Sequence, residues 1–272
     1  MGGERYNIRN QKDIMEIKPK IALTITSCKR PEEFVMTIES LSDRLKDIHL
    51  IDTIIHYDDS SDDDARVRMQ QTLEQSFDGI QIIHRRFETD SFTTNKRHMS
   101  VMNHWIDDLV SLGVDYVLHT EEDWLYELDF NITEAIKLIE HDEKCAQVGF
   151  SQKMRQFPDD INVKTFGNFW EWAYLPNRGI TENLFLDTAI MEEVNIPGYW
   201  CYFINWPHFS LRPGVYDVRR IDSVGRFEDL EISFELDFAK RYAEKFVTYE
   251  HNNQICRHIG DISSYNINES ER

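Results

Sequence analysis

The chain has 272 residues, of which 41% are hydrophobic, and its 49 acidic and 30 basic residues give a formal net charge of −19. A chain of this size can bury the core of one elaborated α/β domain or of two small ones, and we expect one. Such an acidic surface repels nucleic acid and anionic membranes, which argues against both as partners. A nucleotide diphosphate can still bind if a divalent cation and one or two basic side chains neutralise its phosphates.

Residues 1–19 are polar throughout and lack the apolar run of a signal peptide, so we expect an N-terminal arm. No stretch approaches the ~20 apolar residues of a membrane span. The four cysteines, Cys28, Cys145, Cys201 and Cys256, lie far apart and have no zinc-site spacing, which favours reduced thiols. These features predict a soluble, cytoplasmic protein, and no pattern indicates its oligomeric state.

Short apolar runs alternate with amphipathic segments from residue 20 to about residue 150. Strands are expected at 21–26, 50–56, 80–84, 116–119 and 147–150, and helices from Pro31, between 64 and 80, at 94–112 and at 131–141. This alternation predicts an α/β fold with a mostly parallel central sheet and helices on both faces.

The second half of the chain departs from this alternation. Residues 151–215 are irregular and rich in aromatic side chains, which is typical of a binding elaboration. An amphipathic helix is expected over 228–244, and the chain ends in a polar segment that contains His258.

In a doubly wound sheet, ligands bind beyond the carboxyl ends of the strands, so the polar residues that follow each strand are candidates for a site. After the first strand, Thr26 and Ser27 offer hydroxyls and Arg30 a cation for a nucleotide and its phosphates. A capped helix start with a surface cation explains the same residues equally well.

Two acidic segments follow later strands. Asp58 and Asp59 stand at a strand end, where a carboxylate accepts hydrogen bonds from a base or a ribose, whereas residues 62–64 fit a solvated turn. Glu121, Glu122 and Asp123 follow the strand at 116–119. Carboxylates two positions apart on an extended segment point to the same side and can hold a ribose hydroxyl and Mn²⁺ or Mg²⁺, although an acidic loop is common after any strand.

A third acidic segment, Glu228 and Asp229, opens the expected helix at 228–244. Acids in a first helical turn ordinarily complement the helix dipole, and this simpler interpretation suits Glu231 well. A carboxylate at the rim of a cleft can instead take a proton from an incoming hydroxyl.

Taken in order, these segments resemble the GT-A glycosyltransferases, in particular the family 2-like group, over roughly residues 20–260. Thr24 to Pro31 resembles that family's first strand and turn, and Asp58 to Ser61 its D-D-x-S segment, in which an aspartate contacts the base. Glu121 to Asp123 occupies the place of its D-x-D metal site, with Glu at the first position, so the resemblance assigns the metal to Asp123. The E-D segment of the family assigns Asp229 as the catalytic base.

Looser matches complete the resemblance. Asn95 and Lys96 fall where the family contacts the diphosphate or donor sugar, and His258 falls where several members supply a C-terminal metal ligand, although a lone His in a polar tail is equally often a surface residue. The motifs are also similar to glycosyltransferases of large algal viruses, which build capsid glycans in the host cytoplasm. The resemblance implies one domain, with a nucleotide-sugar-binding half (20–125) and an acceptor-binding, catalytic half (126–272).

The resulting hypothesis is a metal-dependent, inverting glycosyltransferase that moves a sugar from a UDP-sugar, with xylose as the suggested sugar, to a glycan hydroxyl. Trp124, Trp170 and Trp172 are candidates for the acceptor platform, with Glu228 beside them, although an aromatic core explains each ring equally well. A non-catalytic glycan- or nucleotide-binding module on the same scaffold is one alternative. A sugar-phosphate nucleotidyltransferase is another, but it normally carries a Gly-rich loop after the first strand, which this chain lacks.

Overall fold

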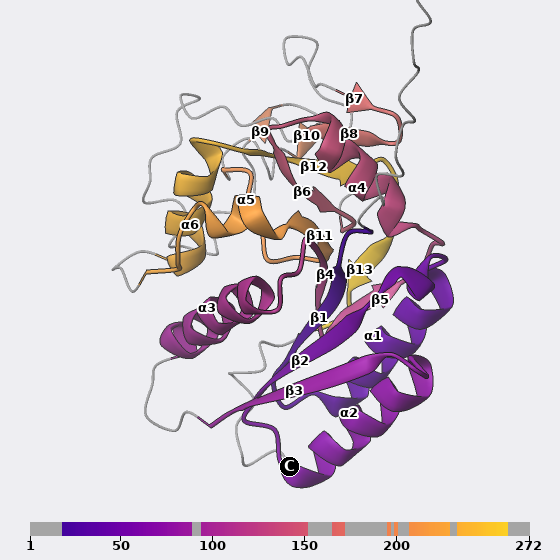
Figure 1. Ribbon diagram of the computed structural model, residues 1–272. Helices are drawn as coiled ribbons and strands as arrows, with labels where there is room; N and C mark the ends of the chain where they lie inside the picture. The colour runs from indigo at the N-terminus through magenta and orange to yellow at the C-terminus, as the bar shows by residue number, and fades with distance from the viewer. Residues whose placement is uncertain are drawn as a thin grey trace, which may run out of the picture.

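The computed structural model describes residues 18–88, 94–151, 165–171, 195–196, 199–200, 207–228 and 233–260. Its central sheet has nine strands in the order β3-β2-β1-β4-β11-β6-β12-β8-β7 (Figure 1). These strands are β1 (Ile21–Ser27), β2 (Thr53–Asp59), β3 (Gln81–Phe87), β4 (Tyr116–Glu121), β6 (Cys145–Gly149), β7 (Thr165–Phe166), β8 (Phe169–Glu171), β11 (Gly214–Asp217) and β12 (Val247–His251). In this sheet β11 and β8 run against the other strands, so the mostly parallel arrangement is confirmed.

Helices cover both faces of the sheet. One face carries α1 (Pro31–Arg44), α2 (Asp63–Ser76) and α4 (Ile132–His141), and the other carries α3 (Thr94–Ser111), α5 (Val218–Asp222) and α6 (Phe234–Ala243) (Figure 1). A short 3₁₀ helix, η1 (Ile48–Leu50), lies between α1 and β2. The predicted α/β fold class is therefore confirmed.

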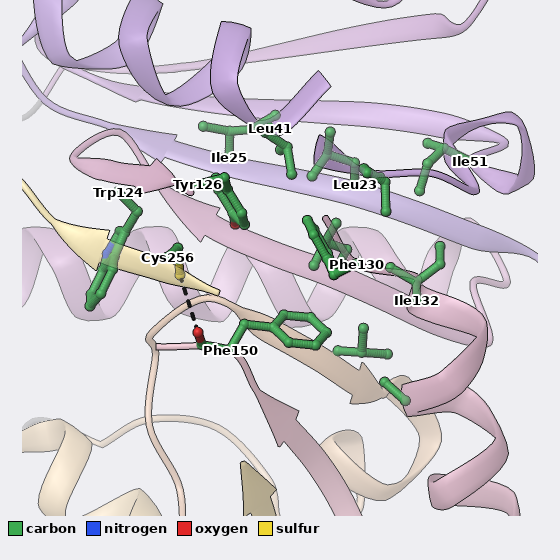
Figure 2. Packing of buried hydrophobic residues seen from close by; sticks show 14 of the residues in the cluster. Leu23, Ile25, Leu41, Ile51, Trp124, Tyr126, Phe130, Ile132, Phe150 and Cys256 are labelled. Atoms are coloured by element: carbon green, nitrogen blue, oxygen red, sulfur yellow. Dashed lines mark hydrogen bonds between the residues drawn. The ribbon is translucent and has the colours of Figure 1, made fainter. Parts of the chain in front are cut away.

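Strand β1 shows how the sequence specifies the two layers. Successive side chains on a strand point to opposite faces, and here Leu23 and Ile25 enter the core under α1 while Ala22 enters the core under α3. Figure 2 shows Leu23 and Ile25 beside Leu41 of α1, with Phe130 and Phe150 packed below them. Because β1 is fully buried, apolar residues stand on both of its faces, in the run from Ile21 to Leu23 and again at Ile25.

The segment that contains His258 is a strand, β13 (Cys256–His258), rather than a polar tail. It pairs antiparallel with β5 (Trp124–Tyr126), which places His258 opposite Trp124. The Cys256 thiol is buried and donates to the carbonyl oxygen of Phe150 at 3.6 Å (Figure 2). A second small sheet pairs β9 (Asn195–Ile196) with β10 (Tyr199–Trp200).

The helix expected over 228–244 is shorter in the structure, where α6 begins at Phe234 and Glu228 is not helical. Asn103 of α3 explains why Phe227 does not lead straight into a helix. Its side chain donates to the Phe227 carbonyl oxygen at 3.0 Å and accepts from the Phe227 N–H at 2.8 Å. The Phe227 ring stacks on Phe238 with centroids 4.2 Å apart, which packs Phe227 against α6.

Three features expected of the chain as a whole can be compared with the described residues. Cys145 and Cys256 are free thiols, in line with the expected reduced state, and both are buried, as is Cys28; Cys201 lies outside the described residues. No helix in the described part of the chain is long and apolar enough to cross a membrane. Most of the N-terminal arm and much of the aromatic segment at 151–215 lie outside the described residues.

Candidate active site

Three neighbouring strands end at one edge of the sheet and bring their terminal polar residues together. In the parallel pairs, Ser27 lies opposite Asp58 and Thr26 opposite Glu121. A pocket opens at this edge. Its lining consists of Thr26, Ser27, Cys28, Tyr57, Asp59, His98, Val101, Glu121 and Glu122.

Three consecutive carboxylates stand where β4 ends and turns into β5, and α1 fixes this turn. Thr37, fully buried on α1, donates to the Glu122 carbonyl oxygen at 2.5 Å and accepts from the Trp124 N–H at 3.1 Å. The Glu122 side chain accepts from the Cys28 N–H at 3.2 Å, and the Trp124 indole donates to Glu121 at 3.3 Å. The turn is thereby attached to both β1 and α1.

Asp123 is held by a guanidinium and an imidazole that come from distant parts of the chain. Nη1 of Arg30, the residue before α1, donates to Oδ2 of Asp123, and Nε2 of His258 lies 3.1 Å from the same oxygen. Arg30 is only 6% exposed, so the interpretation of this residue as a surface cation is wrong.

The three carboxylates of the turn titrate differently. Burial, followed by the charge of Asp123, raises the pKa of Glu121 to about 7 and that of Glu122 well above its ordinary value. Burial also acts to raise the pKa of Asp123, but the hydrogen bonds and charges of His258 and Arg30 outweigh it, so that pKa is lowered. The hydrogen bond to Asp123 raises the pKa of His258. The negative charge of the turn is therefore concentrated on Asp123.

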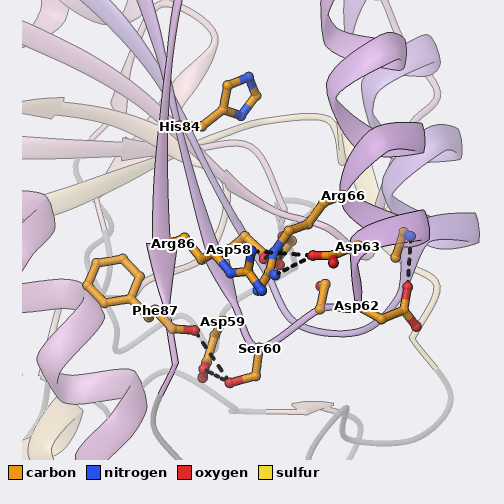
Figure 3. Close-up of polar contacts among 12 residues, drawn as sticks. Asp58, Asp59, Ser60, Asp62, Asp63, Arg66, His84, Arg86 and Phe87 are labelled. Carbon is orange, nitrogen blue, oxygen red and sulfur yellow. Dashed lines mark hydrogen bonds and ion pairs between the residues drawn. The ribbon is translucent and has the colours of Figure 1, made fainter.

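The two aspartates at the end of β2 have different partners (Figure 3). Asp58 accepts from Nε of Arg66 at 2.5 Å and from the Ser27 hydroxyl at 3.4 Å, and it does not line the pocket. Asp59 lines the pocket, accepts from Ser60 at 2.9 Å and lies 3.5 Å from a guanidinium nitrogen of Arg97. Of the two, Asp59 has the better position for contact with a ligand.

The structure places the remaining predicted site residues as follows. Asp62 caps α2 by accepting from the Ala65 N–H at 2.8 Å, which agrees with a turn-forming role. Lys96 is exposed in the first turn of α3, and Glu228 is exposed before the start of α6. Trp124 is buried, with its ring 5.2 Å from that of His258. The side chains of Asn95 and Trp170, and all of Trp172 and Asp229, lie outside the described residues.

Several residues that contribute to the site were not among those predicted. Tyr57 and His98 line the pocket from β2 and α3, and burial lowers the pKa of His98 to about 4, so its imidazole is neutral. Thr37 could have been found from the sequence, because it is a polar residue on the apolar stripe formed by Phe34, Ile38 and Leu41. Nothing in the sequence around His98 distinguishes it from a surface histidine.

Asp123 and His258 form the part of this site with the chemistry of a cation site. Within the described ranges, no group of three His, Cys, Asp or Glu side chains is placed to hold a metal ion. Asp123 and His258 nevertheless converge to within 3.1 Å, so one oxygen and one nitrogen lie where they could act as ligands. A cation that also binds phosphate oxygens and water needs only a few protein ligands, so the pair fits Mn²⁺ or Mg²⁺ bound together with a diphosphate.

The fold is the GT-A fold, a mostly parallel α/β sheet whose site lies at the carboxyl ends of β2, β1 and β4. TarS from S. aureus superposes with a TM-score of 0.53 and 10% identity over 90% of this chain and 38% of its own. TarS 1–349 in complex with UDP-GlcNAc superposes with a TM-score of 0.52 and 13% identity, over 92% of this chain and 61% of its own. The mannosyltransferase PcManGT from Pyrobaculum calidifontis, in complex with GDP-Man and Mn²⁺, superposes with a TM-score of 0.54 and 11% identity. The match covers 90% of this chain and 58% of that protein.

This chain therefore spans about 60% or less of the length of those solved proteins. No model of a known protein family matches the sequence, and no curated protein matches it. At this level of identity the likeness establishes the fold alone.

Proposed function

We propose that the protein is a glycosyltransferase that moves a sugar from a nucleotide diphosphate to a hydroxyl of a glycan, with a divalent cation and with inversion at the anomeric carbon. The observation that supports this most is a pocket lined by Asp59, Glu121 and Glu122 at the carboxyl ends of the strands. The next residue after Glu122 is Asp123, which Arg30 and His258 both contact. Solved proteins of this fold bind UDP, UDP-GlcNAc and GDP-Man.

The donor would bind in the half formed by residues 20–125. Asp59 would accept a hydrogen bond from the base, Thr26 and Ser27 would contact the nucleoside, and Glu121 and Glu122 would face the ribose. Asn95, Lys96 and Arg30 would lie towards the diphosphate. UDP is the nucleotide that the family resemblance favours, and UDP-xylose is the first sugar donor to test.

Asp123 and His258 would hold the divalent cation, which when bound neutralises charge on the diphosphate as it leaves. Asp229 would take the proton from the acceptor hydroxyl as that oxygen attacks the anomeric carbon from the opposite face. Positioned general bases typically contribute about 10²–10⁴-fold to the rate. We place the acceptor in the half formed by residues 126–272, on Trp170, Trp172, Trp124 and Glu228.

Donor binding is tested first by thermal unfolding of the protein with Mn²⁺ and a panel of UDP, GDP, dTDP and CMP, with and without chelator. A ligand of the folded state stabilises it by RT ln(1 + [L]/Kd), so nucleotide at about 100 times Kd adds about 2.7 kcal/mol. We expect one diphosphate nucleotide to raise the melting temperature and the chelator to remove the shift. No shift with any nucleotide would contradict the proposal.

The two acidic roles are separated by substitution. Asp123→Asn should lose the chelator-sensitive part of nucleotide binding, whereas Asp229→Ala should bind donor normally and lose about 10²–10⁴-fold in turnover. Glu231→Ala, which removes a carboxylate two positions from Asp229, is the matched control and should keep its turnover. Normal turnover by Asp229→Ala would show that another group is the base.

A further inference from the structure

Arg30 binds Asp123, the carboxylate that would hold the divalent cation. Its Nη1 donates to Oδ2 of Asp123, which His258 also contacts, and the ion pair is almost entirely buried. The chain that follows β13 closes over it, because the Ile259 N–H donates to the Asp123 carbonyl oxygen at 2.8 Å. A Cβ on Gly260 would lie 2.7 Å from Nη1 of Arg30, so the main chain itself packs against the guanidinium.

A guanidinium and a divalent cation cannot both bind one carboxylate oxygen without strong repulsion in a poorly solvated site. A buried guanidinium that loses its carboxylate must also find another acceptor, since an unpaired buried charge is costly. A diphosphate supplies such an acceptor, and guanidinium groups bind phosphate oxygens well.

We propose that Arg30 is an internal cation that competes with the divalent metal for Asp123, and that the diphosphate relieves this competition by drawing Arg30 onto its phosphate oxygens. This inference rests on the proposed function. Its consequence is that metal and nucleotide bind cooperatively: the metal alone binds weakly because it must displace Arg30, and nucleotide removes that barrier. By linkage, the metal strengthens nucleotide binding by the same factor.

The test measures binding and needs no turnover. Free Mn²⁺ is followed by its EPR signal during titration of the wild type, Arg30→Gln and Arg68→Gln, each with and without saturating UDP and, separately, GDP. Arg68 is a matched control because it is a half-exposed arginine that pairs with Glu32 on a helix surface, so its substitution changes the net charge equally without touching Asp123.

For Arg30→Gln we expect Mn²⁺ alone to bind at least about tenfold more tightly than to the wild type, because a repelling unit charge at contact distance from the ligand is gone. The factor by which nucleotide improves Mn²⁺ binding should fall by at least about tenfold, because Arg30 no longer links the two sites. Arg68→Gln should match the wild type in both measurements.

Unchanged or weaker binding of Mn²⁺ alone by Arg30→Gln would overturn the inference and leave Arg30 as a positioning residue for Asp123. If Arg30→Gln does not fold, Arg30→Met decides the question, because it also removes the charge and keeps an unbranched side chain in the buried position. A wild-type affinity for Mn²⁺ alone in Arg30→Met would overturn the inference, and a several-fold tighter affinity supports it. If the wild type binds no Mn²⁺ either with or without nucleotide, the proposed function fails together with the inference. If the wild type binds Mn²⁺ with nucleotide but Arg30→Gln shows no gain for Mn²⁺ alone, only the inference fails.

Discussion

Thr37 connects helix α1 to the turn that carries Asp123, and its removal tests how that turn is held. The hydroxyl donates to the Glu122 carbonyl oxygen at 2.5 Å and accepts from the Trp124 N–H at 3.1 Å, on a side chain with no exposed surface. Thr37→Val preserves the shape of the side chain and deletes both hydrogen bonds. It leaves one buried carbonyl and one buried N–H without this partner.

Each buried polar group that loses its hydrogen bond costs about 1–3 kcal/mol. With some relaxation of the turn, we expect Thr37→Val to lower the free energy of unfolding by about 2–4 kcal/mol. For a chain of this length that corresponds to a fall of roughly 5–15 °C in the melting temperature. The affinity for Mn²⁺ with nucleotide should fall as well, because Asp123 follows the released carbonyl directly.

Urea unfolding followed by tryptophan fluorescence measures the first effect, and Mn²⁺ titration in the presence of UDP measures the second. Ser42→Ala is the control, since its hydroxyl also donates to a backbone carbonyl, that of Glu39 at 3.0 Å, but on the exposed side of the same helix. A free energy of unfolding for Thr37→Val within about 0.5 kcal/mol of the wild type would refute the reasoning, because surface changes have effects of that size.

Three further predictions concern other parts of the protein. His119 is fully buried, and its burial lowers its pKa from 6.5 to about 3. As the pH falls below 6.5, the unfolded chain therefore takes up the proton before the folded chain does. At pH 5 this difference costs about 2 kcal/mol of stability. Urea unfolding at pH 7.5 and pH 5 should show a smaller acid loss for His119→Gln, and an identical loss would contradict this. Gly149→Ala places a methyl group against the buried carboxylate of Glu250 and should lower the free energy of unfolding by about 1–3 kcal/mol in the same assay. An unchanged free energy of unfolding would contradict this close packing. Asp59→Asn should weaken nucleotide binding at least about tenfold. Asp63→Asn is the control and should leave nucleotide binding unchanged, because the Asp63 side chain is 85% exposed. Equal effects of the two substitutions would show that Asp59 has no special role in nucleotide binding.

The fold was predictable because strands such as β1 and β2 are buried between helices on both faces, which leaves short apolar runs separated by amphipathic segments. The element boundaries were less accurate. Residues 50–52 precede β2 because Ile48–Leu50 forms a 3₁₀ turn. At the other end, β2 continues through Asp58 and Asp59 because both pair with β3, so polar residues expected after the strand belong to it.

The carboxylates of the site could be found from their position after strands, but the contacts between them could not. Arg30 and His258 lie 93 and 135 positions from Asp123, and no local pattern encodes such pairings. His258 stands in a sequence of polar residues and is ordered by main-chain pairing with β5, which periodicity does not reveal. The start of α6 was misplaced for a similar reason, since Asn103 occupies the backbone groups of Phe227 from a distant helix.

The pairing of β13 with β5 also sets the order in which the site is assembled during synthesis. His258 is made 135 residues after Asp123, and at typical elongation rates of about 5–20 residues per second this delay is roughly 7–27 s. During that interval β1, β2, β3 and β4 can pair with one another, while Asp123 has Arg30 but not His258 beside it. A nascent chain that has not yet reached β13 therefore lacks both the histidine and the main chain that packs over Asp123.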